Sequence, residues 1–576
     1  MPAGMNGATT MTATIDYGVT MSMRDGAGLR ADLWRPAGPG PHPAVLIRTP
    51  YGRSLFNADA LRPEHCVRRG YACIVQDARG TGDSGGDWAP FQWDQEALDT
   101  FDSVEWVAAQ PWCDGNVAMA GASYLGIVQW LGAAARPPHL RAVAPGMHSS
   151  GELERAASGG AVRLNQLVYW LALTTLEWAR YRRQAGHAVD PAVDAAMLAL
   201  LEDPTPAVLR LPLDAMPQFD IPGLPVDLRA VLAGTAGLPP RYEYERVAVP
   251  TLSLGGWYDI YCSATIAAFQ AMARAQPDAG HRLIIGPWSH DGHLPGVQGQ
   301  RNFGPAGYAG FADVPGRHLA FFDEHLKGRR ADPVPAVQYF LMGADEWRTA
   351  DSWPPRTSRS ETWYLASRGD ARTASGNGRL VREPGVSEAV QDVLCHDPED
   401  PVPSHGGRVA SMGRLVGGPL DRRGVEARSD VLCYTGERLD RALDVVGAVT
   451  VRLFAATSAR DADFAVKLVD VAPDGTALPV AEGLLRARYR EGIDAAEPVE
   501  PDVTYEYRVD LGDTAWRFHA GHRIRLEIAG SDFPQFDRNA GTGAPIGTDT
   551  EVLAARHRIF HNRVSPSSVT CDVDRE

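Results

Sequence analysis

The feature that most constrains this chain is a serine, Ser123, that stands between a strand pattern and a helix pattern. Residues 116–120 are short and apolar, which predicts a buried strand, and residues 124–135 are rich in Leu, Ala, Gln and Trp, which predicts a helix. A serine on such a sharp turn has the position of a nucleophile, and the free N–H groups at the helix N-terminus suit a developing oxyanion. Leu125 stands where the common Gly-x-Ser-x-Gly pattern has its second glycine, and Gly126 follows it. For this motif alone, a turn without chemistry therefore stays open.

Length, charge and cysteine spacing narrow the class of protein. The chain has 576 residues, enough for about two to four domains, and its net charge of −15 argues against a nucleic acid partner. No apolar run reaches the roughly 18 residues of a membrane span, and the first ten residues lack the features of a secretory signal. The seven cysteines are scattered, without a Cys-x-x-Cys pair, which argues against a disulfide framework or a zinc site. We therefore expect a cytoplasmic protein without a membrane partner.

The strand and helix patterns predict four segments along the chain. In residues 1–150 and again in 245–355, strands alternate with helices, which is typical of a mostly parallel sheet covered on both faces. Residues 151–244 have helical spacing and a proline-rich stretch, and we interpret them as a helical cap inserted over the sheet edge. In residues 356–576 the apolar period changes to two, which favours a β-sandwich or jelly roll.

The helical cap carries two bulky aromatic side chains in the middle of its strongest helix pattern, residues 162–183. Tyr169 and Trp170 could face a substrate from this position. Packing of the cap helices against each other explains the same two residues equally well.

A serine nucleophile needs a base and an acid that orients the base, and two loops offer them. Asp259 lies in the loop predicted after the strand at 251–254, and His290 lies in the loop predicted after the strand at 282–285. One helix pattern, residues 262–275, separates these strands, so they form a single βαβ unit and both loops project from the same sheet edge. The expected chain order is Ser123, Asp259, His290.

Two neighbouring residues compete for these roles. His293 is the alternative to His290, and Asp291 is the alternative to Asp259. Asp291 is adjacent to His290 in sequence, which is a poor position for orienting its imidazole ring.

The chain resembles the bacterial cocaine esterase group of α/β-hydrolases, which is related to X-Pro dipeptidyl-peptidases and α-amino-acid ester hydrolases. The segments that carry the resemblance are 48–52, 76–80, 112–117, 121–126, 255–259, 286–290, 397–403, 461–464 and 531–539. They span nearly the whole chain. In this group the sequence motif of the nucleophile turn is Gly-x-Ser-Tyr-x-Gly. The resemblance implies an α/β-hydrolase core, a helical cap insertion and a C-terminal jelly-roll-like β-sandwich domain.

The resemblance also implies a role for each site residue. Ser123 is the expected nucleophile, His290 the base and Asp259 its orienting acid. By similarity, the oxyanion hole consists of the Tyr51 hydroxyl and the backbone N–H of Tyr124. A phenol donor aimed at the oxyanion contributes on the order of 3 kcal/mol.

The expected reaction is two-step acyl transfer from a small-molecule ester, without a metal or organic cofactor. Trp170 and Tyr261 are the expected walls of the acyl pocket. Residues 406–411 are small or polar where the family has bulkier apolar residues, which predicts a smaller or more polar pocket and small to medium acyl or aryl esters. A homodimer is an open expectation.

Three other functions stay open at this point. An amidase or acylase can use the same three residues. An aminopeptidase of the X-Pro dipeptidyl-peptidase type, or an α-amino-acid ester hydrolase, needs carboxylates for an ammonium group, and residues 260–263 after Asp259 contain none. A binding protein on an inactive hydrolase scaffold would not react with a fluorophosphonate at Ser123.

Overall fold

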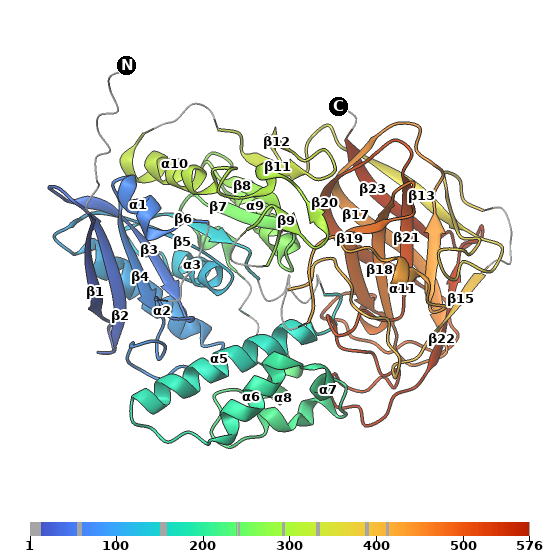
Figure 1. The fold of residues 1–576 in the computed structure, drawn as a ribbon, viewed down its shortest axis with the longest axis horizontal. Helices are drawn as coiled ribbons and strands as arrows, with labels where there is room; N and C mark the ends of the chain where they lie inside the picture. The colour runs from blue at the N-terminus through green and yellow to red at the C-terminus, as the bar shows by residue number, and fades with distance from the viewer. Residues whose placement is uncertain are drawn as a thin grey trace, which may run out of the picture.

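A computed structural model of the protein describes residues 13–54, 60–149, 158–234, 236–237, 239, 242–290, 294–329, 334–385, 391–410 and 414–574. Three bodies lie against one another in it (Figure 1). An α/β body occupies one end, a β-rich C-terminal body occupies the other, and a group of helices lies beneath and between them.

The α/β body is built on a ten-stranded sheet with the order β1-β2-β4-β3-β5-β6-β7-β8-β11-β12. Its strands are β1 (Ala13–Ser22), β2 (Gly28–Pro36), β3 (His42–Thr49), β4 (Ala72–Asp77), β5 (Cys113–Ala122), β6 (Leu140–Gly146), β7 (Leu252–Tyr258), β8 (Arg282–Ser289), β11 (Val337–Leu341) and β12 (Glu346–Ala350). From β4 to β11 all neighbours pair in parallel, whereas β1, β2 and β12 add antiparallel edges. A parallel sheet aligns the carboxyl ends of its strands at one edge.

Helices cover this sheet because its central strands are apolar on both faces; every residue of β4 and of β8 is buried. The helices are α1 (Pro63–Arg68), α2 (Trp93–Ala108), α3 (Tyr124–Ala135), α9 (Cys262–Ala275) and α10 (Val314–Lys327). The pair α1 and α10 pack together, and so do α2 and α3. Short strands β9 (Val297–Gln298) and β10 (Arg301–Asn302) form a separate ribbon.

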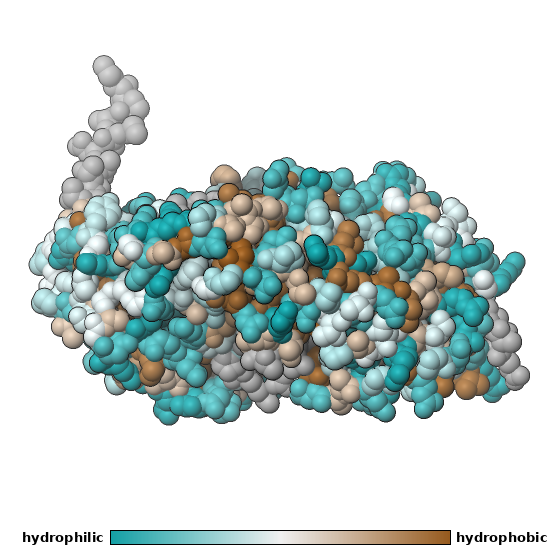
Figure 2. Space-filling model, turned by 90° about the horizontal axis from the view of Figure 1, so that it is seen from below, coloured by the Kyte–Doolittle hydropathy of each residue, from teal (hydrophilic) through white to brown (hydrophobic). Residues whose placement is uncertain are grey.

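The helical group consists of α5 (Leu164–Gln184), α6 (Ala192–Glu202), α7 (Thr205–Val208) and α8 (Leu228–Leu232). It has an apolar cluster of its own, which includes Leu171, Met197 and, from the C-terminal body, Phe533. The backbone of Asn165 also donates to Pro534 O at 3.0 Å. Seen from the side of these helices, apolar side chains gather along the middle of the molecule (Figure 2).

The C-terminal body contains an eleven-stranded, largely antiparallel sheet. The first of its strands along the chain is β13. Its elements are β13 (Arg359–Ala366), β14 (Arg379–Val381), β15 (Gln391–His396), α11 (Arg423–Glu426), β16 (Val431–Thr435), β17 (Leu443–Thr457), β18 (Asp463–Val471), β19 (Ala477–Arg486), β20 (Tyr505–Phe518), β21 (Arg523–Ala529), β22 (Ala555–Phe560) and β23 (Ser568–Asp574). The predicted division of the chain at residues 150, 244 and 355 stays a prediction.

Candidate active site

The turn around Ser123 is strained in a way that explains its two glycines. Ser123 caps α3 with φ 62° and ψ −127°, a backbone conformation that costs a non-glycine residue about 1–3 kcal/mol. At Gly126 a Cβ atom would lie 2.8 Å from Gly146 O, so only glycine lets α3 approach β6 this closely. Gly121 has φ 135°, and a Cβ there would lie 2.6 Å from Leu125 Cβ. The glycine one position later than in the common pattern therefore serves helix-to-strand packing.

Three predicted site residues lie in one hydrogen-bonded row. His290 Nδ1 is 2.6 Å from Asp259 Oδ2, and His290 Nε2 is 3.0 Å from Ser123 Oγ. The Asp259 side chain is fully buried, and its other oxygen accepts from the Tyr261 N–H at 2.7 Å. The sequence alternatives His293 and Asp291 lie outside the described residues.

The sheet brings these residues together because each follows the carboxyl end of a parallel strand. Ser123 follows β5, Asp259 follows β7 and His290 follows β8. Strands β7 and β8 are neighbours, and only β6 separates β7 from β5. Residues 167 positions apart in the chain thus meet at one sheet edge.

Tyr51 and the first residue of α3 border Ser123. The Trp170 Nε1–H donates to Tyr51 Oη at 3.2 Å. Burial raises the pKa of the Tyr51 phenol, while its hydrogen bonds with Trp170 and Ser123 act in the opposite direction. Tyr124 is the first residue of α3, so its N–H has no acceptor within the helix. Both groups can donate to an oxygen beside Ser123.

A buried ion pair ties the two segments that carry these donors. Arg48, near the end of β3, donates to Glu96 Oε2 at 2.7 Å, and its side chain is 0% exposed. Glu96 Oε1 accepts from the Tyr124 hydroxyl at 2.9 Å. Arg48 lies three residues before Tyr51, so this network connects the β3 loop, α2 and the start of α3.

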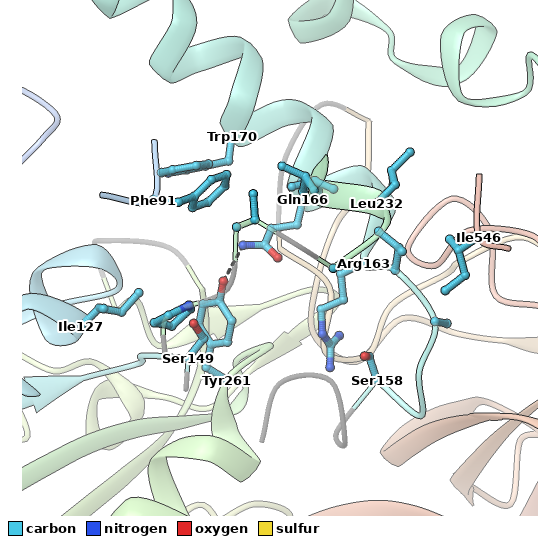
Figure 3. A pocket seen from close by; sticks show the side chains of 18 of the residues that line it. Phe91, Ile127, Ser149, Ser158, Arg163, Gln166, Trp170, Leu232, Tyr261 and Ile546 are labelled. Carbon is cyan, nitrogen blue, oxygen red and sulfur yellow. Dashed lines mark hydrogen bonds between the residues drawn. The ribbon is translucent and has the colours of Figure 1, made fainter. Parts of the chain in front are cut away.

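A cavity of about 220 Å³ opens beside Ser123, and all three bodies contribute to its wall. Phe91 and Trp170 pack with tilted rings, their centroids 5.2 Å apart, and form part of an apolar side with Trp93 and Ile127. Arg163, Gln166 and Tyr261 give a more polar side, where Gln166 Nε2 donates to Tyr261 Oη at 2.5 Å (Figure 3). The cavity can therefore hold a largely apolar small molecule with a few polar contacts.

Both residues predicted as pocket walls line this cavity. Trp170 reaches it from α5, and Tyr261 also packs edge-on against the His290 ring, with centroids 5.1 Å apart. Tyr169 is not among the described lining residues.

The expectation that residues 406–411 shape the acyl pocket stays a prediction: residues 406–410 are not among the described lining residues, but Ala410 packs against the wall residue Tyr261. Arg408 instead turns into the body, where it donates to Trp257 O at 3.1 Å and to Leu511 O at 2.8 Å. The Arg408 guanidinium thus donates its hydrogen bonds to buried backbone carbonyls.

Several lining residues were missed by sequence reasoning. Gln166 lies four residues before Trp170, so the helical repeat of α5 could have placed both on one face. Phe91, Trp93 and Arg163 carry no comparable signal. Tyr489 and Ile546 come from the C-terminal body, more than 300 residues away from Ser123 in the chain, and no local pattern points to them.

The described residues show neither a metal-binding cluster nor a helix suited to a membrane. They contain no group of three or more His, Cys, Asp or Glu side chains that could hold a metal ion. Among the helices of the described ranges, none combines the length and the apolar character that a membrane crossing requires.

Comparison with known proteins assigns this chain to a family. A family model described as X-Pro dipeptidyl-peptidase (S15 family) matches residues 25–292, and one described as X-Pro dipeptidyl-peptidase C-terminal non-catalytic domain matches residues 330–570. Cocaine esterase from Rhodococcus sp. (strain MB1 Bresler) is 36% identical over 577 residues, which cover 96% of this chain and 98% of that protein.

Solved structures agree with these matches. An aminopeptidase from the marine sediment archaeon Thaumarchaeota archaeon gives a TM-score of 0.75 at 25% identity, covering 100% of this chain and 98% of that one. An α-amino acid ester hydrolase gives a TM-score of 0.73 at 23% identity, covering 99% and 98%. The predicted fold class, an α/β-hydrolase core followed by a C-terminal β domain, is confirmed. The chain belongs to the cocaine esterase-like family of α/β-hydrolases, related to the X-Pro dipeptidyl-peptidases.

Proposed function

We propose that this protein is a serine esterase that hydrolyses small to medium acyl or aryl esters through an acyl-enzyme on Ser123. The observation that carries the proposal is the row from Asp259 through His290 to Ser123, with contacts of 2.6 and 3.0 Å, beside a cavity with an apolar wall. The identity to cocaine esterase over nearly the full length of both chains supports the same reaction class.

In this mechanism Ser123 attacks the ester carbonyl carbon while His290 Nε2 takes the serine proton. Asp259 accepts a hydrogen bond from His290 Nδ1 and stabilises the imidazolium that forms. His290 then protonates the leaving alcohol oxygen. Water, deprotonated by His290, attacks the acyl-enzyme and releases the carboxylic acid, which restores Ser123.

The tetrahedral intermediate carries a negative oxygen that needs donors already in position. We assign these donors to the Tyr51 hydroxyl and the Tyr124 N–H at the positive end of α3. Removal of one such donor typically costs about 10²–10³ in kcat. A Tyr51→Phe variant should therefore lose roughly a hundredfold in kcat and keep its KM.

The size of the cavity supports small to medium substrates. Its volume of about 220 Å³ lies below the roughly 300–1,000 Å³ of sites for drug-sized ligands. Trp170 and Phe91 give the apolar contact that an acyl or aryl group needs. A long acyl chain should not fit within the described walls.

The charge of the cavity favours an ester over an aminopeptidase substrate. Among its described lining residues there is no Asp or Glu, and the charged side chain is the cation of Arg163. A substrate ammonium would meet no carboxylate among these described residues, so they offer it no compensation for lost hydration. An amidase reaction uses the same catalytic residues, but no contact in the described cavity selects an amide.

We also propose that the protein acts in the cytoplasm, which its seven unpaired cysteines favour. We propose that it acts on a small-molecule substrate and without nucleic acid, and the net charge of −15 argues against a nucleic acid partner. A homodimer stays a prediction that light scattering of the purified chain can measure.

The test is hydrolysis of 4-nitrophenyl acetate, butyrate, benzoate and dodecanoate by the parent and by Ser123→Ala. The parent should turn over the first three esters and Ser123→Ala should lose at least about a thousandfold in kcat. Ser360→Ala, in β13 and outside the cavity, is the matched control. Equal rates for Ser123→Ala and the parent would refute the mechanism, and fast dodecanoate cleavage would refute the substrate size.

A further inference from the structure

Two sets of hydrogen bonds border the cavity, one from Asp259 through His290 to Ser123 and one from Trp170 to Tyr51, and the direction of each can be derived. An ionised carboxylate only accepts, so Asp259 requires the proton on His290 Nδ1 and leaves Nε2 as an acceptor. Ser123 Oγ must then donate to His290 Nε2. The Ser123 oxygen keeps its lone pairs for another donor.

At Tyr51, the indole of Trp170 fixes the direction of the hydrogen bond. The Trp170 Nε1–H can only donate, so at 3.2 Å it occupies a lone pair of Tyr51 Oη. A hydroxyl has one proton, so with this lone pair occupied the Tyr51 O–H points away from Trp170, and Tyr51 lines the cavity together with Ser123. The Tyr51 proton is therefore available to the cavity, where the carbonyl oxygen of a substrate bound at Ser123 becomes the oxyanion.

We infer that Trp170 is a positioning residue that orients and polarises the Tyr51 hydroxyl for the oxyanion. The inference rests on the proposed esterase mechanism and adds a second role to a residue expected only as a pocket wall. A hydrogen bond received by the phenol oxygen strengthens the bond that the same hydroxyl donates, an effect of about 10–30% per bond. Tyr51 is partly buried against the apolar core, which limits how far water screens this effect.

The place of Trp170 in the fold makes it suited to this role. It lies on α5 of the helical group, whereas Tyr51 follows β3 of the α/β body. Its ring packs against Phe91 and is stacked on the Tyr124 ring at a centroid distance of 6.5 Å. One side chain thus contacts both residues proposed as oxyanion donors, and docking of the helical group orients them together.

The test is a double-mutant cycle with Trp170→Phe, Tyr51→Phe and the double variant, measured on 4-nitrophenyl butyrate. Phenylalanine keeps an aromatic wall and removes the N–H donor. Trp170→Phe should lower kcat about three- to tenfold, the value of one neutral hydrogen bond, with KM within about twofold. In the Tyr51→Phe background the same change should have no further effect on kcat.

Trp93→Phe provides the matched control cycle. Trp93 lines the same cavity, but its Nε1–H donates to Gly237 O at 3.3 Å and not to Tyr51. Whatever Trp93→Phe does to kcat, it should do equally with and without the Tyr51 hydroxyl. Titration with a fluorophosphonate counts the folded active sites, so a poorly folded variant is not mistaken for a slow one.

The outcomes separate this inference from the function on which it rests. If Tyr51→Phe lowers kcat but Trp170→Phe costs the same in both backgrounds, or changes only KM, Trp170 is a wall and the inference is overturned alone. If Tyr51→Phe leaves kcat unchanged, the oxyanion role of Tyr51 fails and this inference fails with it.

Discussion

Glu96→Gln is the substitution that tests most sharply how the donor segments are held. The Glu96 side chain is 6% exposed and pairs with Arg48, whose side chain is 0% exposed. Glutamine keeps the shape but removes the charge, which leaves the Arg48 guanidinium buried without a counter-ion. Breaking a buried pair from one side costs about 3–5 kcal/mol. Tyr124→Phe, which removes only the hydrogen bond at 2.9 Å, should cost about 1.5–3 kcal/mol.

Urea unfolding followed by tryptophan fluorescence, together with ester turnover, measures both effects. Glu105→Gln is the matched control on the same helix, because its pair with His139 has side chains 27% and 43% exposed and should be worth at most about 1 kcal/mol. We expect Glu96→Gln to lose the most stability, Tyr124→Phe less and Glu105→Gln the least. The first two variants should also have a lower kcat. Equal stability of Glu96→Gln and Glu105→Gln would refute the reasoning.

The remaining predictions concern packing, pH and substrate charge. Gly126→Ala should destabilise the protein by about 1–3 kcal/mol and lower kcat, because its Cβ would lie 2.8 Å from Gly146 O; a variant with the parent's melting temperature and kcat would contradict this. Burial lowers the pKa of His148 and of His318 to about 4, whereas the unfolded side chains titrate near 6.5. The unfolded state therefore binds more protons between these values, and stability, full above pH 6.5, should fall by about 2 kcal/mol per histidine at pH 5 in urea titrations. A pH-independent midpoint would contradict this. L-Alanine 4-nitroanilide should be cleaved far more slowly than 4-nitrophenyl acetate is hydrolysed, because the described lining residues include no carboxylate for its ammonium group; the reverse order would contradict this assignment.

The sequence predicts the helices around the site well. The predicted helices at 124–135 and 262–275 agree with α3 (Tyr124–Ala135) and α9 (Cys262–Ala275) in the structure. Both follow a strand and carry an apolar face, and the first ends before two prolines, so local signals and tertiary packing agree there.

The strands that carry the acid and the base were predicted to end too early. Gly255 and Gly256 indicate a loop, yet β7 continues through them to Tyr258. At Gly256 a Cβ would lie 2.2 Å from Trp288 O, so the glycine allows close approach of β8 instead of ending the strand. A close approach between two strands is a tertiary contact that composition does not encode.

The residues of the candidate site also differ in how well the sequence predicts them. The order and loop positions of Ser123, Asp259 and His290 could be predicted because parallel strands align their ends. The walls given by Tyr489 and Ile546 could not, because they depend on how the C-terminal body docks. The network of Arg48 and Glu96 also escaped prediction, since buried charged pairs leave no periodic pattern.

The most direct test of the central claim is the site of covalent reaction with a fluorophosphonate. The purified parent should gain one phosphonyl group, and peptide mass spectrometry should locate it on Ser123, with no labelling of Ser123→Ala or of heat-unfolded protein. If the parent stays unlabelled although a cooperative unfolding transition shows that it is folded, or if the label lies on another residue, the assignment of Ser123 as an activated nucleophile is contradicted.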